Sequence, residues 1–293
     1  MDFHTSVPAK CILAGEHVIV HRGFAFVTPF SNYTLTLGYT KDSVRTIQTI
    51  STEGENSLSI MLWPVVSHAL MLAEKNPAEL TGFFTIHSSI PIGAGLGFSA
   101  AICVAVARWC LYYGLISQME LFEFAIQLEN EFHIKSSGLD IAGVMSSGVI
   151  KYSTNHEIQP IEPRWRPRLY VSSSGEKSIT DSCVKTVNAL RKTNPELATT
   201  IDDRMLDSAR EIQMALESEA TEGFLLLESA LNKGNQCFYD WGLVSEKLHQ
   251  HVQELKKHAK ACKIVGAGYG GHVISLWDKE PDVHLPFKLH RLL

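Results

Sequence analysis

The sequence lacks several patterns that would assign it at once to a known class of protein. Its six cysteines form no CxxC pair and show no spacing typical of a zinc site. Its 26 basic residues are outnumbered by 31 acidic ones, which argues against nucleic-acid binding. The longest apolar helical stretch, residues 100–113, is interrupted by Arg108 and is too short to span a membrane. The N-terminus has no basic segment followed by an apolar one, so no secretory signal is expected.

The composition is that of an ordinary globular protein. Of its 293 residues, 45% are apolar and 19% charged, which is ample material for a hydrophobic core. The length suits one large domain or two smaller ones, and we place a boundary within residues 155–168, which contain three prolines. The cysteines lie at positions 11, 103, 110, 183, 237 and 262. We expect them to be buried, reduced thiols of a cytoplasmic protein.

Hydrophobic periodicity predicts a mixture of helices and strands. Helices are expected at residues 58–73 and 99–113, from a capping box at Ser117 to about residue 132, in two stretches around 181–232, and at 244–260. Strands are expected at residues 33–37, 83–87, 148–152, 169–171, 263–265 and 272–276.

The most informative stretch is residues 91–101, in which glycine occupies every second position from Gly93 to Gly97. An expected strand precedes this loop and an expected helix follows it. A glycine loop that leads into a helix N-terminus presents backbone N–H groups to an anion, and the phosphate chain of a nucleotide is the natural ligand. The residues expected to bind it are Gly93, Ala94, Gly95, Leu96, Gly97, Phe98 and Ser99.

A second glycine run, residues 266–271, matches the dinucleotide-binding pattern GxGxxG. A strand rather than a helix is expected after it, so the physical basis of that pattern is missing. We interpret the match as chance, or as a tight turn that brings the backbone close to a ligand. Neither glycine run carries the lysine of a Walker A loop.

Four side chains have the chemistry that phosphoryl transfer requires, which is mainly positioning and charge neutralisation. Ser99 and Glu129 could bind Mg²⁺, because Ser99 follows the loop and Glu129 lies on the apolar stripe of its helix. Asp140 follows a Ser-Ser-Gly turn and could act as a base. Lys10 precedes an apolar strand and could hold that aspartate ionised.

Three of these residues, and also His17, which follows Gly15-Glu16 and could face a polar substrate, have simpler interpretations as well. Glu129 could reach out to solvent from the helix boundary, and Lys10 could be a surface charge. Asp140 could cap a helix, and His17 could be a hydrogen-bonded loop histidine. The functional interpretation depends on their joint occurrence.

Three segments, residues 8–17, 91–101 and 266–271, resemble the three motifs of the GHMP kinases in the family's order. Residues 174–178 and 235–245 resemble further segments of the family, so the similarity covers nearly the whole chain. It is closest to the mevalonate kinases, because Glu16 and His17 follow Gly15 and because Glu129 stands eleven positions before Asp140.

The resemblance implies an α+β fold of two domains, residues 1–160 and 161–293, with the active site in the cleft between them. It implies that ATP and Mg²⁺ are used to phosphorylate the C5 hydroxyl of mevalonate, a small-molecule substrate, in isoprenoid precursor synthesis. No nucleic-acid or membrane partner is implied, and the family pattern is compatible with a homodimer.

The resemblance also implies roles for single residues. Asp140 would take the proton from the C5 hydroxyl, and Lys10 would lower the pKa of that hydroxyl. Ser99 and Glu129 would bind Mg²⁺, and residues 93–99 would cradle the phosphates of ATP. The substrate would be bound by Lys10, Glu16, His17, Asp140 and Gly268.

The chain departs from the family pattern in four places. Ala9 and Tyr269 replace glycines, Phe98 replaces a serine, and Ile134 and Ser136 replace a glycine and a proline before the aspartate. These changes leave two alternatives open. The acceptor could be phosphomevalonate or another small hydroxylated metabolite, or the chain could bind nucleotide without catalysis. Retention of the four chemical side chains argues against the second alternative.

Overall fold

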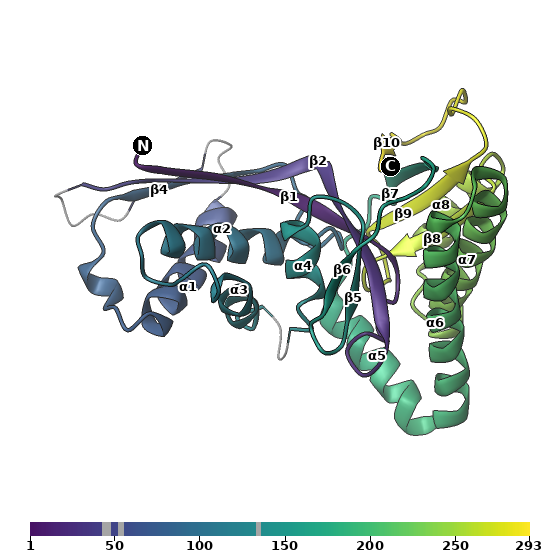
Figure 1. Ribbon diagram of the computed structural model, residues 1–293, viewed down its shortest axis with the longest axis horizontal. Coiled ribbons are helices and arrows are strands. Elements are labelled where there is room, and N and C mark those ends of the chain that lie inside the picture. The colour runs from purple at the N-terminus through teal and green to yellow at the C-terminus, as the bar shows by residue number, and fades with distance from the viewer. Residues whose placement is uncertain (43–47, 52–55, 133–135) are drawn as a thin grey trace. The chain divides into compact units, whose positions relative to one another are not determined.

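The computed structural model describes residues 1–42, 48–51, 56–132 and 136–293 (Figure 1). Helices and strands are mixed along the chain, which confirms the predicted α+β class. The chain forms two compact units. The first comprises Met1–Ala9, Phe30–Pro91 and Gly97–Met145, and the second comprises Lys10–Pro29, Ile92–Leu96 and Ser146–Leu293.

Both units are discontinuous in sequence because strands β1 (Phe3–Ala14) and β2 (Phe24–Thr40) each pass from one unit into the other. The glycine loop is divided as well, since Ile92–Leu96 belongs to the second unit and the chain from Gly97 onwards belongs to the first. A boundary near residue 160 and an active-site cleft between two consecutive domains stay predictions.

In the first unit, helices lie on one face of a group of strands (Figure 1). Strand β4 (Phe83–Ser88) pairs antiparallel with β2 and parallel with β3 (Gln48–Ser51). The helices are α1 (Asn56–Leu72), α2 (Phe98–Tyr112), α3 (Leu121–Glu129) and α4 (Leu139–Met145), with a short 3₁₀ helix at Pro77–Glu79. The predicted helices at 58–73 and 99–113 and the strand at 83–87 are therefore confirmed.

Helix α2 is the centre of this unit. Residues 100–107 are all buried, and the helix packs against α1, α3 and α4. A helix that is apolar on every side is stable only inside a core. Its N-cap is Gly97, whose positive φ of 79° suits glycine, so the helix begins directly after the glycine loop.

In the second unit, a four-stranded antiparallel sheet has the order β10-β7-β9-β8. Its strands are β7 (Arg168–Ser173), β8 (Ala261–Val265), β9 (His272–Trp277) and β10 (His290–Arg291). The helices of this unit are α5 (Thr180–Thr193), α6 (Pro195–Glu217), α7 (Ala220–Asp240) and α8 (Glu246–Lys256). The first part of β2 pairs with β5 (Ile150–Ser153), which pairs with β6 (Ile158–Pro160).

Two of the helix predictions need correction. The two helical stretches expected around 181–232 are three helices, because the chain breaks at Asn194, which caps α6 by accepting a hydrogen bond from Leu197 N at 3.2 Å. Helix α3 begins at Leu121 rather than Ser117 and ends at Glu129. The amide of Ser117 does donate to the Glu120 carboxylate at 2.7 Å, but in a turn that precedes the helix.

All six cysteines are buried and free, as predicted. Burial raises the pKa of the Cys11 thiol to about 12, so the thiolate is scarce at neutral pH. Among the described residues, no helix is both long and apolar enough to cross a membrane.

Candidate active site

The second unit brings together three segments that lie far apart in the sequence. They are the end of β1 with the turn after it, the glycine loop at Ile92–Leu96, and the glycine turn between β8 and β9. These are the segments that resemble the three family motifs, and hydrogen bonds join each of them to another.

Lys10 binds the glycine loop twice. Its backbone N–H donates to Leu96 O, and its ammonium donates to Gly95 O, both at 3.0 Å. The Lys10 side chain is only 1% exposed, so its interpretation as a surface charge is wrong. A buried ammonium retains its charge only where polar groups compensate the loss of water, and the Gly95 carbonyl is one such group.

Two other residues bind the same loop, and sequence reasoning selected neither of them as a site residue. The N–H of Ser178 donates to Gly93 O at 2.6 Å. The imidazole of His272 donates from Nδ1 to Ala94 O at 3.0 Å, since a carbonyl can only accept. His272 begins strand β9 and is 2% exposed, and desolvation lowers its pKa.

The carbonyls of four consecutive loop residues, 93–96, therefore all accept hydrogen bonds. In the part of the chain that the structure describes, the N–H groups of the same four residues donate to no protein acceptor. Gly93 and Gly95 have positive φ values of 71° and 75°, and backbone that alternates in this way forms concavities for anions. The loop thus has fixed carbonyls and available N–H donors, as a phosphate ligand requires.

The second glycine run packs directly against this loop. A Cβ on Gly266 would lie 2.9 Å from the Cα of Gly95, and one on Gly271 would lie 2.9 Å from Ala94 O. Both glycines also have positive φ values, 83° and 84°. The run is a tight turn, and what its glycines allow is the approach of backbone to backbone.

The segment 174–178 fixes this turn from the other side. The Ser178 hydroxyl donates to Gly268 O at 2.6 Å, and the Ser174 hydroxyl donates to Gly271 O at 2.9 Å. Ser178 therefore binds both glycine runs, one through its amide and the other through its hydroxyl.

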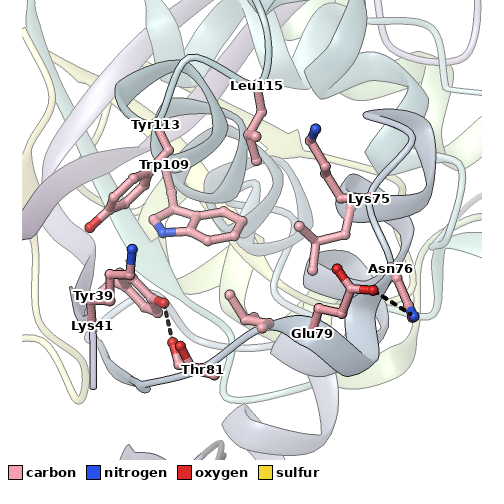
Figure 2. A pocket seen from close by; sticks show the side chains of 11 residues that line it. Tyr39, Lys41, Lys75, Asn76, Glu79, Thr81, Trp109, Tyr113 and Leu115 are labelled. Carbon is pink, nitrogen blue, oxygen red and sulfur yellow. Dashed lines mark hydrogen bonds between the residues drawn. The ribbon is translucent and has the colours of Figure 1, made fainter. Parts of the chain in front are cut away.

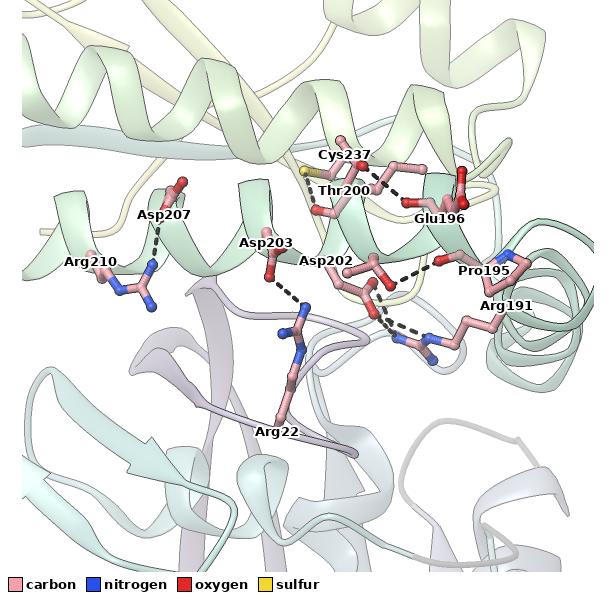
Figure 3. A network of polar contacts seen from close by, with 12 residues as sticks. Arg22, Arg191, Pro195, Glu196, Thr200, Asp202, Asp203, Asp207, Arg210 and Cys237 are labelled. Carbon is pink, nitrogen blue, oxygen red and sulfur yellow. Dashed lines mark hydrogen bonds and ion pairs between the residues drawn. The ribbon is translucent and has the colours of Figure 1, made fainter.

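His17 follows Glu16 in the first segment and has the left-handed φ of 61°. Its Nε2–H donates to Ala267 O at 2.9 Å, and desolvation lowers the pKa of the ring to about 4, so the ring is neutral at pH 7. Arg191 of α5 donates to the carbonyl of His17 at 3.0 Å and pairs with Asp202 of α6, also at 3.0 Å (Figure 3). His17 has the contacts of a hydrogen-bonded loop histidine, and contact with substrate stays a prediction.

Glu16 is 3% exposed, and its carboxylate binds the ammonium of Lys263, a residue on β8 that sequence reasoning did not select. A charged residue within the apolar run 261–265 was the available signal. Contact of Glu16 or Gly268 with a substrate also stays a prediction.

The remaining predicted residues lie in the first unit, at the ends of three helices. Ser99 is the second residue of α2, Glu129 the last of α3 and Asp140 the second of α4, and α2 packs against both other helices. Asp140 is inside the first turn of its helix, so it is not the cap. The structure thus divides the predicted residues between its two units.

Glu129 is 2% exposed, so the alternative in which it reaches solvent is wrong. Its carboxylate accepts a hydrogen bond from the Ser136 hydroxyl at 2.5 Å, and that hydroxyl accepts one from Gly138 N at 3.0 Å. Ser136 is one of the departures from the family pattern, and it orders the turn before Asp140. Ile134, the departure next to it, lies outside the described residues.

Two of the other three departures have local explanations, and nothing in the structure explains the tyrosine at position 269. Ala9 lies in β1 and lacks a positive φ, so a side chain is tolerated there. Phe98 is the first residue of α2 and is 5% exposed, so its ring belongs to the core. Tyr269 adopts a left-handed φ of 58°, a conformation that favours glycine.

Among the described residues, no group of three or more His, Cys, Asp and Glu side chains could hold a metal ion. Mg²⁺ that arrives with a nucleotide needs only one or two protein ligands besides phosphate oxygens and water. A buried carboxylate at Glu129 and a hydroxyl at the start of α2 fit that limited requirement.

The first unit also contains a cavity of about 360 Å³. Aromatic side chains of Tyr39, Trp109 and Tyr113 line it, together with Lys41 and Lys75 (Figure 2). None of its lining residues is a predicted site residue, so it contributes nothing to the site described above.

Comparison with known proteins places these observations in a family context. Residues 64–148 match the GHMP kinases N terminal domain, a segment that contains Ser99, Glu129 and Asp140. A mevalonate kinase of Archaeoglobus fulgidus is 27% identical over 94% of this chain and 92% of its own length. A mevalonate kinase of Pyrococcus abyssi is 28% identical over 92% of this chain and 87% of its own length.

Among solved structures, L. major mevalonate kinase in complex with R-mevalonate superimposes with a TM-score of 0.74 at 21% identity, over 95% of this chain and 88% of that one. At that identity the match establishes the fold. Taken together, the comparisons confirm the resemblance to GHMP kinases, closest to mevalonate kinases, and the predicted class of activity, an ATP-dependent small-molecule kinase.

Proposed function

We propose that this kinase transfers the γ-phosphate of ATP to the C5 hydroxyl of mevalonate. One observation carries the choice of acceptor: curated relatives that align with nearly the whole chain share the name mevalonate kinase. The loop with four bonded carbonyls and four available N–H groups supports the use of a phosphate donor. We place the reaction in the cytoplasm, in isoprenoid precursor synthesis.

In this proposal residues 93–99 bind the phosphates of ATP through backbone N–H groups. Ser99 and Glu129 would hold Mg²⁺, which would neutralise phosphate charge when bound. The buried position of Glu129 supports this role, because a carboxylate out of water is stabilised by a nearby cation.

Asp140 accepts the proton of the C5 hydroxyl as that oxygen attacks phosphorus in line with the leaving ADP. The ammonium of Lys10 stabilises the negative charge that develops on the attacking oxygen. Its bond to Gly95 O gives it a fixed position beside the phosphate loop. Glu16, His17 and Gly268 form the part of the site that binds mevalonate. Glu16 and His17 are themselves bonded to other protein groups, which fixes the shape of this part.

The test of the acceptor is the release of ADP by purified protein with Mg-ATP and, in turn, mevalonate, phosphomevalonate and no acceptor. Turnover with mevalonate is expected. Turnover with phosphomevalonate alone would refute the proposal in favour of the second acceptor. Binding of ATP without turnover on either compound would indicate a non-catalytic protein.

The test of the base is Asp140→Asn. We expect kcat to fall by about 10²–10⁴-fold, the usual contribution of a general base, with little change in ATP affinity. Asp203→Asn is the matched control, because Asp203 forms an exposed pair with Arg22 at 2.6 Å (Figure 3). Near-normal turnover of the Asp140 variant would remove Asp140 from this role.

A further inference from the structure

A fully buried ion pair joins the first segment of the site to strand β8. The ammonium of Lys263 bonds to Oε1 of Glu16, and the two side chains are 0% and 2% exposed. The pair links residues 247 positions apart in the sequence, within the second unit. The proposed chemistry uses neither charge, so the pair needs an explanation of its own.

The groups around Lys263 accommodate both its charged ammonium and its aliphatic stem. Its ammonium also donates to Ile264 O at 2.9 Å and lies 5.3 Å from the ring centroid of Phe238. Gly234 of α7 makes room for its stem, since a Cβ there would lie 3.0 Å from Cδ and Cε of Lys263. A side chain without charge would leave Glu16 as an uncompensated buried carboxylate, which is strongly unfavourable.

Glu16 lies within the electrostatic reach of two lysines. Burial raises the pKa of Glu16, and the ammonium groups of Lys263 and, more weakly, Lys10 oppose that rise. In the described structure Oε1 bonds to Lys263, while Oε2 of Glu16 is buried and bonds to no protein group. Glu16 is therefore a buried carboxylate that is bonded to Lys263 through one oxygen and is also subject to the charge of Lys10.

We propose that Lys263 is a positioning residue: by binding Glu16 it fixes the turn at residues 15–17 and prevents that carboxylate from pairing with Lys10. The Lys10 ammonium then stays on Gly95 O, beside the loop that binds phosphate. This inference rests on the proposed function, in which Lys10 acts on the acceptor hydroxyl.

The proposal predicts what loss of Lys263 does. In Lys263→Met, the Glu16 carboxylate has no partner at Oε1 and attracts the Lys10 ammonium away from Gly95 O. The acceptor hydroxyl loses its neighbouring charge, and the phosphate loop loses one of its four carbonyl bonds. Protonation of Glu16 would release Lys10 again, so the defect should shrink as the pH falls.

The experiment compares Lys263→Met, Glu16→Gln and the double variant by kcat, KM and thermal unfolding, at a temperature where each is folded. We expect Lys263→Met to lower kcat by about 10- to 100-fold, the range of coupling between contacting groups. The double variant should have nearly the same kcat as Glu16→Gln alone, because no buried carboxylate remains to compete for Lys10 and the loss of Lys263 then has little further effect. Because burial raises the pKa of Glu16, the loss in Lys263→Met should also become smaller as the pH falls.

Lys233→Met is the matched control. Lys233 lies on α7 and pairs with Glu211, but its side chain is 41% exposed, so its loss should leave kcat unchanged. If Lys263→Met does not fold, Gly234→Ala is the second variant. It displaces the lysine stem without removing a charge, and it should likewise have little further effect on kcat in the Glu16→Gln background.

Two outcomes would overturn the proposal. Unchanged kcat in Lys263→Met, with only a lower unfolding temperature, would make the pair purely structural. A double variant with a kcat far below that of Glu16→Gln alone would mean that Lys263 acts on the reaction by a route other than Glu16. Failure of the proposed function would give a different result, because the wild-type protein itself would then not turn over mevalonate. ATP affinity without acceptor would still fall in Lys263→Met and recover in the double variant.

Discussion

The two glycine runs of the second unit have similar sequences but differ in the use of their backbone N–H groups. In residues 93–96 every carbonyl accepts a hydrogen bond and no N–H is used within the described protein. In residues 266–271 the amides of Tyr269 and Gly271 donate to Leu243 O and Glu176 O, and the glycines lie against other backbone. The first run is arranged for a ligand, and the second is arranged to support the first.

This difference shows that glycine content alone does not identify a phosphate loop. What distinguishes the two runs is the element that follows, a helix after the first and a strand after the second, and whether their N–H groups are bonded within the described protein. Alanine substitutions at glycines of either run test this comparison. The largest loss of stability is expected in residues 266–271, the run that supports the other.

Gly266→Ala should be the most damaging of these changes. Its Cβ would lie 2.9 Å from the Cα of Gly95, and its φ of 83° is unfavourable for alanine. Strain and overpacking together should cost about 2–5 kcal/mol of stability and should displace the phosphate loop. Chemical unfolding and the affinity for an ATP analogue measure the two effects.

Gly242→Ala is the control for Gly266→Ala. Gly242 has a similar φ of 72°, and nothing lies within 4 Å of its Cβ position, so only the strain should remain. Equal losses of stability in the two variants would contradict the close approach of the two glycine runs.

Gly93→Ala should have a smaller effect on the fold and a specific effect on the ligand. The nearest atom to its Cβ would be Ser178 O at 3.5 Å, so the φ of 71° is the main cost, about 1–2 kcal/mol. ATP affinity should fall by more than it does in Gly242→Ala, which carries the same strain away from the loop. Unchanged ATP affinity would exclude Gly93 from the phosphate site.

Acid should weaken both runs, because each is bonded to a buried neutral histidine. His17 binds Ala267 O, and His272 binds Ala94 O. Desolvation lowers the pKa of His17 from 6.5 to about 4 and lowers that of His272 as well. The unfolded chain therefore takes up protons first, so the stabilisation is complete above pH 6.5 and declines as the pH falls towards 4.

Thermal unfolding between pH 7.5 and pH 5 measures this decline. In His17→Gln the unfolding temperature should fall less steeply with decreasing pH. Other charged groups facing the two rings are Arg191 and Lys263 near His17, and His290 near His272. His4→Gln changes an exposed histidine and should leave the pH dependence as it is. An unaltered slope in His17→Gln would show that its burial does not govern the acid response.

Tyr269→Gly should have the smallest effect. The left-handed φ of 58° disfavours tyrosine, while glycine is more flexible in the unfolded chain, and the two terms nearly cancel. The lost contact between the hydroxyls of Tyr269 and Thr186, at 3.3 Å, is weak. We expect stability to change by less than about 1 kcal/mol. A larger loss would mean that the tyrosine side chain supports the second run.

Local patterns in the sequence predicted much of the fold. The apolar run 100–107 predicted a core helix, and its position after alternating glycines predicted an anion loop. The break between α5 and α6 was also readable, since Asn194 and Pro195 are a typical cap and first residue of a helix. Treating 181–232 as two stretches missed it because periodicity does not reveal short interruptions.

Contacts over long distances in the sequence could not be predicted. The apolar stripe indicated burial of Glu129 as one of two alternatives. It gave no indication of the Glu16–Lys263 pair, because periodicity carries no information on partners 247 positions apart. The bond from His272 to Ala94 was hidden for the same reason. Such contacts depend on how strands are ordered in a sheet, which the chain specifies only collectively.

The rate at which an alkylating reagent labels the buried cysteines should report how often the structure around them opens. Alkylating reagents attack thiolates, and burial raises the pKa of Cys110 and Cys262 to about 12, so labelling should follow exposure. Of the six cysteines, Cys103 and Cys110 lie on α2 in the first unit. The other four lie in the second unit, at positions 11, 183, 237 and 262. Mass spectrometry of labelled peptides would therefore time the opening of each unit separately, with no probe introduced.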